Sequence, residues 1–103
     1  MKPEQFIREQ GLDKAREVVE GRSNTYMPEL FKYWSEELQD YVLAPKYASF
    51  LVEDLKRLVE SVDRVNAFGG LKDAKAVVKM GKHYKYLKAH ISNYESIYGG
   101  GDE

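Results

Sequence analysis

Apolar residues in the second half of the chain recur at helical spacing. One stripe is formed by Leu51, Leu55, Leu58, Val59, Val62 and Val65. Charged residues lie largely off this stripe, which is typical of a helix with one buried and one solvated face. The sequence predicts a long helix that opens at Pro45 and ends near Phe68, after which Gly69-Gly70 turns the chain.

A second long helical segment is expected from Leu71 to Tyr98. Its heptad-like seam consists of Val77, Met80, Tyr84, Leu87, Ile91, Tyr94 and Tyr98. The first turns do not follow this seam, so Gly81 marks a kink, a helix break or a close helix–helix contact. The short Gly-Gly link favours antiparallel packing of the two long helices, while self-association through the seam would make the protein a homo-oligomer.

Two short helices are predicted near the N-terminus, from Pro3 to Gln10 and from Asp13 to Glu20. They stop at Gly11 and Gly21, since glycine is common where a helix ends. Helices of this length are not stable in isolation, so both must pack on another element.

The segment PELFKYWSEELQDYVLA, residues 28–44, is also expected to be helical. Its apolar residues at steps of three and four include Leu30, Phe31, Trp34, Leu38, Tyr41 and Val42. The aromatic residues leave a strand near Tyr41 open as an alternative. The sequence thus predicts an all-α fold. One domain over residues 1–98 is built on an antiparallel helical hairpin with the short N-terminal helices packed against it, and residues 99–103 form a flexible tail.

The net charge of −1 provides no global attraction to nucleic acid or acidic membranes, so any such binding depends on local clustering. The absence of cysteine excludes disulfides and thiolate zinc sites. The start, MKPEQFIREQ, lacks the apolar core of a signal peptide, and no apolar run reaches the roughly 20 residues of a membrane helix. We therefore expect a cytoplasmic protein with no membrane partner.

Lysines cluster between Lys72 and His90, where six lysines accompany one acid, Asp73. On a continuous helix one face would carry Lys72, Lys75, Lys79 and Lys82, with His83, Tyr86 and His90 beside it. Such a face can neutralise phosphates and stack on bases, although it is more often the solvated side of a helix. The helix–glycine–helix outline also fits a helix-turn-helix, but the lack of arginine weakens base recognition.

No catalytic motif is present, and the serines have no evident base partner. His83 and His90 are seven residues apart, whereas helical metal sites more often use residues four apart. We therefore expect no enzymatic activity, no metal site and no cofactor.

Aromatic residues crowd the middle of the chain. The helical pattern places Phe31, Trp34, Leu38 and Tyr41 in the core. Tyrosine and tryptophan are also favoured in protein interfaces. We therefore take Tyr33, Trp34 and Tyr47 as candidate protein-binding residues.

Three stretches, FIREQGLDKAREVVEG, DLKRLVESVDRVNAFGGLKDAK and NYESIYGGGDE, resemble small accessory proteins of lambdoid bacteriophages and enterobacterial prophages. The resemblance covers about half of the chain and leaves out residues 22–49. The family is mostly uncharacterised, so the resemblance implies a bacterial setting and assigns no functional residue. We expect a non-enzymatic accessory protein that binds a host or phage protein. The alternative is nucleic-acid binding through the lysine-rich face of the C-terminal helix.

Overall fold

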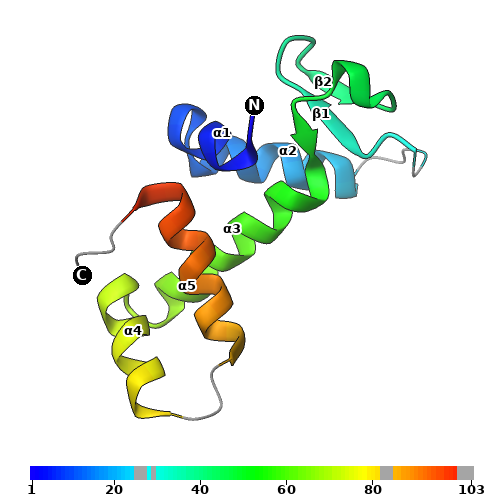
Figure 1. Ribbon diagram of the computed structural model, residues 1–103. Coiled ribbons are helices and arrows are strands. Elements are labelled where there is room, and N and C mark those ends of the chain that lie inside the picture. The colour runs from blue at the N-terminus through cyan, green and yellow to red at the C-terminus, as the bar shows by residue number, and fades with distance from the viewer. Residues whose placement is uncertain (25–27, 29, 82–84, 100–103) are drawn as a thin grey trace. The chain divides into compact units, whose positions relative to one another are not determined.

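The computed structural model describes residues 1–24, 28, 30–81 and 85–99 (Figure 1). These residues form mostly helices and one small three-stranded antiparallel sheet, so the fold is α+β and the all-α prediction is wrong in this respect. The chain divides into two compact units, Met1–Arg57 (unit 1) and Leu58–Glu103 (unit 2), and each is described by itself. The single domain over residues 1–98 stays a prediction, because compact units also occur within one domain. Of the expected tail, residues 100–103 lie outside the described residues.

Unit 1 begins with the two predicted short helices, α1 (Pro3–Gln10) and α2 (Leu12–Asn24). Gly11 separates them with φ 92° and ψ 160°, a conformation that glycine adopts without strain. The predicted end of α2 at Gly21 is wrong, because the helix continues through this residue for another turn. The buried apolar side chains of the two helices include Phe6, Ile7, Ala15 and Val18.

The aromatic segment predicted to be helical forms a β-hairpin instead. β1 (Tyr33–Ser35) pairs antiparallel with β2 (Asp40–Val42), and Trp34 lies opposite Tyr41. Their rings meet edge to face with centroids 5.0 Å apart, a cross-strand contact that stabilises the pair. β3 (Phe50–Leu51) pairs with the other side of β1, which gives the strand order β2-β1-β3.

Local hydrogen bonds close the turn between β1 and β2. Ser35 Oγ accepts the N–H of Leu38 at 3.1 Å, and Gln39, at φ 53°, donates from Nε2 to the carbonyl of Glu36 at 2.7 Å. The N–H of Glu36 donates to Ser49 Oγ at 2.9 Å. Serine and glutamine side chains thus bond backbone groups that a helix would pair internally, which favours the turn over the predicted helix.

The predicted start of the long helix at Pro45 is also wrong. Pro45 opens a short 3₁₀ helix, η1 (Pro45–Tyr47), and α3 (Val52–Ala67) begins only after β3. The N–H of Ser49 donates to the carbonyl of Trp34 at 2.7 Å. The residues after η1 are therefore held along β1 as sheet and do not start the helix.

Unit 2 contains the end of α3 together with α4 (Leu71–Met80) and α5 (Lys85–Tyr98). The expected helix over residues 71–98 is interrupted, and of the three interpretations of Gly81 the helix break is confirmed. Gly81 has extended backbone angles, φ −127° and ψ 147°, and caps α4. The predicted turn at Gly69-Gly70 is confirmed, with φ 102° and 116°.

Within unit 2, α5 packs antiparallel to α4 and also packs on α3, whereas the two helices that flank Gly69-Gly70 do not form the extensive pair that was predicted (Figure 1). The core of the unit is formed by Val65, Leu71, Ala74, Leu87 and Ile91. Leu87 and Ile91 of the predicted seam are thus mostly buried within the unit. Met80 of the same seam is 81% exposed, and Tyr84 lies outside the described residues.

Candidate functional site

The residues of the predicted face are divided between α4, α5 and a segment that lies outside the described residues. Lys72, Lys75 and Lys79 lie on α4, and Tyr86 lies on α5 with 84% of its side chain exposed. Lys82 and His83 fall outside the described residues. Because α4 and α5 are separate antiparallel helices, the face is not one continuous stripe, and the prediction is wrong in that respect.

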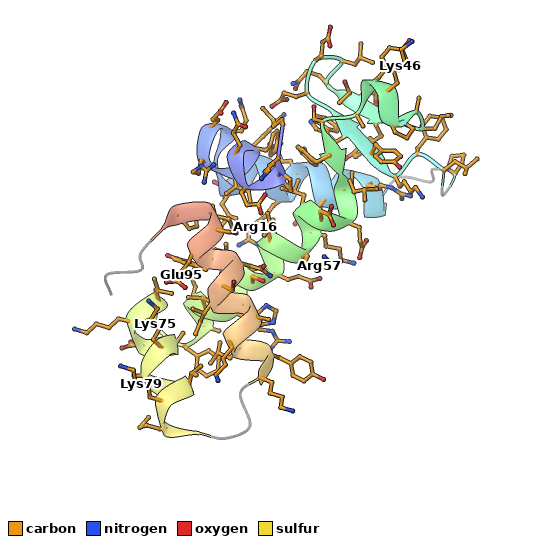
Figure 2. The ribbon with its side chains drawn as sticks, in the orientation of Figure 1. Arg16, Lys46, Arg57, Lys75, Lys79 and Glu95 are labelled. Atoms are coloured by element: carbon orange, nitrogen blue, oxygen red, sulfur yellow. The ribbon has the colours of Figure 1, made fainter. Side chains whose placement is uncertain are left out.

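An open groove of about 380 Å³ lies between α4 and α5. We call it the lysine groove, and it is lined by Lys75, Val78, Lys79, Lys88, Ile91, Ser92 and Glu95. Lys75 and Lys79 lie one turn apart on α4, and the antiparallel course of α5 brings Lys88 to the opposite wall. Figure 2 shows Lys75 and Lys79 on α4 with Glu95 on the adjoining α5.

The charge of the lysine groove differs between its two ends. At one end Lys75 Nζ lies 2.9 Å from Glu95 Oε2, so an ion pair joins the two walls. At the other end Lys79 and Lys88 are exposed. Val78 and Ile91 belong to the apolar packing of the unit, so apolar groups separate the cationic walls.

Unit 1 carries a second candidate surface around its sheet. We call it the apolar sheet surface, and it comprises Leu30, Leu38, Leu43 and Tyr47. These side chains are between 53% and 69% exposed. The ammonium group of Lys46 lies 5.4 Å from the centroid of the Tyr47 ring, within cation–π range.

The three predicted protein-binding residues differ in exposure. Tyr47 is exposed, and Tyr33 is half-buried on β1. Trp34 is only 6% exposed, and its indole Nε1 has no hydrogen-bond partner among the described residues. Trp34 therefore lies in the core of unit 1, as the sequence analysis also expected. Leu38, expected in the core, is instead exposed because it sits in the hairpin turn.

A buried Ser–His contact was missed by the sequence analysis. Ser61 Oγ on α3 lies 2.8 Å from His90 Nδ1 on α5, and Asn93 Nδ2 donates to the same oxygen at 2.9 Å. The signal in the sequence was a serine on the apolar stripe of α3 and a polar pair three residues apart on α5. Ser61 has no exposed surface, so its hydroxyl cannot reach a substrate, and the contact joins the two helices.

Within the described residues, no group of three or more His, Asp or Glu side chains could hold a metal ion. No helix in that part of the chain is both long and apolar enough to cross a bilayer. The chain matches no family model, no curated protein and no solved structure. The assignment of function therefore depends on the physical character of the two surfaces.

Proposed function

We propose that this protein is a non-enzymatic accessory protein that acts by binding another protein. We further propose that it acts in the bacterial cytoplasm with a host or phage protein as the partner; the bacterial setting is what the resemblance noted above implies. The observation that carries the proposal is the exposure of the four large apolar side chains of the apolar sheet surface, all of which lie within residues 30–47.

Exposed apolar side chains are ordinary when they are scattered, but a concentration of them is typical of an interaction surface. Leu38 lies in the turn of the hairpin, and Leu43 and Tyr47 follow β2 in η1 and the residues before it. The hydrogen bonds of the turn and the pairing of β1 with β2 hold this backbone in place before a partner arrives. A preformed surface loses less conformational entropy on binding, which favours affinity.

The test compares capture by two variants that each remove exposed apolar surface. Leu43→Ser combined with Tyr47→Ala removes apolar surface from unit 1, and Met80→Ser removes it from α4, where Met80 is 81% exposed. Tyr47 is preferred to Tyr33, since Tyr33 pairs with Val42 and Leu51 inside the sheet. Tagged proteins are incubated with nuclease-treated enterobacterial lysate, and each recovered protein is quantified.

We expect one partner to be recovered with the wild-type protein and with Met80→Ser, and at least tenfold less of it with the double variant, at unchanged melting temperature. Equal recovery with all three proteins would contradict the proposal.

A second candidate function is nucleic-acid binding, which is favoured by exposed cations on both helices of unit 2. The exposed lysines of α4 and α5 are Lys72, Lys79, Lys85 and Lys88. Four phosphate contacts would give a slope of about −3.6 for the logarithm of the affinity for duplex DNA against the logarithm of salt concentration. Fluorescence anisotropy with a labelled duplex measures this slope, and binding that is absent at low salt would exclude the candidate.

A further inference from the structure

We propose that the lysine groove is a docking site for an acidic amphipathic helix of a partner protein. The proposal concerns unit 2 alone and does not depend on the apolar sheet surface of unit 1. It is carried by the combination of cationic walls and apolar lining in one open groove between two helices.

The shape of the groove fits a helix. Two antiparallel helices form the walls, and the lining residues extend along α5 from Lys88 to Glu95, about two turns. A third helix laid along this groove can place side chains at positions i, i+3 and i+4 against Val78 and Ile91. This is the usual way in which an amphipathic helix binds a groove.

The charges of the groove determine which sign of charge a bound helix should carry. Lys79 and Lys88 lie on opposite walls, so carboxylates on both flanks of the apolar stripe of a bound helix would each meet an ammonium group. The Lys75–Glu95 ion pair is already formed and adds little net charge at its end of the groove. Selectivity for acidic residues therefore resides at the end marked by Lys79 and Lys88.

A nucleic acid fits this groove less well than an acidic helix does. The Lys75–Glu95 ion pair leaves little net positive charge for phosphates at its end of the groove, and the apolar groups of Val78 and Ile91 give no contact that a phosphate backbone can use. Lys75 is engaged by Glu95 and would have to give up that partner to bind phosphate. The observations therefore favour a protein segment over a polyanion.

The experiment selects the occupant from random sequences. A display library of random peptides, each about 16 residues long, is selected on the full-length protein. The enriched peptides are then synthesised and titrated by fluorescence anisotropy. Two double variants are compared, Lys79→Gln with Lys88→Gln inside the groove and Lys72→Gln with Lys85→Gln outside it on the same two helices. Both remove the same charge, and far-ultraviolet circular dichroism checks that both keep their helix content.

We expect the enriched peptides to combine acidic residues with apolar residues at spacings of three and four. The variant inside the groove should weaken their binding at least tenfold, and the variant outside it less than threefold. The Tyr47→Ala variant, changed in η1 of unit 1, should bind them like the wild-type protein.

Selection that yields no peptide, or peptides without an acidic excess, would overturn the proposal, as would equal weakening by the two double variants. A single-stranded oligonucleotide of about 20 nucleotides serves as the competing probe. The result to compare is displacement of the peptides by the oligonucleotide, with both double variants weakening its binding equally. That result would overturn the docking site in favour of phosphate binding by a broad lysine surface.

Discussion

Ser61 shows how a single polar residue positions two helices. It stands on the otherwise apolar stripe of α3, is fully buried, and contacts both His90 and Asn93 of α5. A buried hydroxyl is tolerated only when it is hydrogen-bonded, so these two contacts specify which part of α5 lies over Ser61. An apolar residue at this position would pack without needing a hydrogen-bond partner on α5.

We predict that Ser61→Ala lowers the free energy of unfolding by about 1–2 kcal/mol, because two polar side chains of α5 lose a shared partner. Urea unfolding measures the loss. Ser92→Ala, at an exposed position on the same helix pair, serves as the control and should change it by less than about 0.5 kcal/mol. Equal effects of the two substitutions would show that the contact is not formed.

Tyr41 joins the hairpin to α2 through its hydroxyl, which donates to the carbonyl of Val18. Burial raises the pKa of Tyr41 above its usual value near 10, and the nearby carboxylate of Asp40 also raises it, while Arg22 opposes both. The folded state therefore holds the phenol proton more tightly than the unfolded chain does.

The sign of this shift gives a pH prediction. The stabilisation is complete below the unfolded pKa near 10 and is lost as the pH rises through the higher pKa of the folded state. Urea unfolding at about pH 9 and pH 11 should therefore show a larger loss of stability for the wild-type protein than for Tyr41→Phe. The same loss in both proteins would contradict the assignment.

At the scale of elements, most helices were predictable, whereas the sheet was anticipated only through the alternative of a strand near Tyr41, which β2 confirms. Helical periodicity correctly predicted α1 and the stripe of α3, because their apolar residues follow one face. The same periodicity is present in residues 30–42. There, however, the side chains of Ser35 and Gln39 hydrogen-bond the backbone of a turn, and the Trp34 ring contacts the Tyr41 ring on the neighbouring strand. Those contacts depend on tertiary structure, which spacing along the chain does not record.

The candidate surfaces were predictable to a similar degree. The lysine cluster and Tyr47 were identified from the sequence, since both depend on residue type. The lysine groove itself was not, because it requires the helix break at Gly81 and the antiparallel return of α5. The expectation that Trp34 lies in the core is confirmed, although the helical pattern that led to it is wrong.

The two glycines that cap α4, Gly70 and Gly81, allow the element boundaries to be tested by substitution. Gly70 has φ 116° and ψ −178°, a region that is essentially restricted to glycine, whereas Gly81 has angles that any residue adopts. We predict that Gly70→Ala lowers the free energy of unfolding by about 1–3 kcal/mol. Gly81→Ala should change it by at most about 0.5 kcal/mol. Chemical denaturation of the two variants checks this, and a Gly81→Ala cost as large as that of Gly70→Ala would refute it.

At the scale of the whole molecule, a nearly neutral chain carries locally distinct surfaces. The net charge is −1, yet the residues between Lys72 and His90 contain six lysines and one acid. Unit 1 presents exposed leucine and tyrosine side chains, and unit 2 presents a cationic groove. Two surfaces of different chemistry suit a protein that binds other proteins, because each can select a different kind of segment.

Hydrogen exchange of the captured complex tests the central claim, that this protein binds a protein partner through the apolar sheet surface. After nuclease treatment, amide exchange is compared between the free protein and the complex. The account predicts slower exchange across residues 36–47 in the complex. Unchanged exchange across those residues, or slowing that appears only in a parallel sample without nuclease treatment, would contradict it.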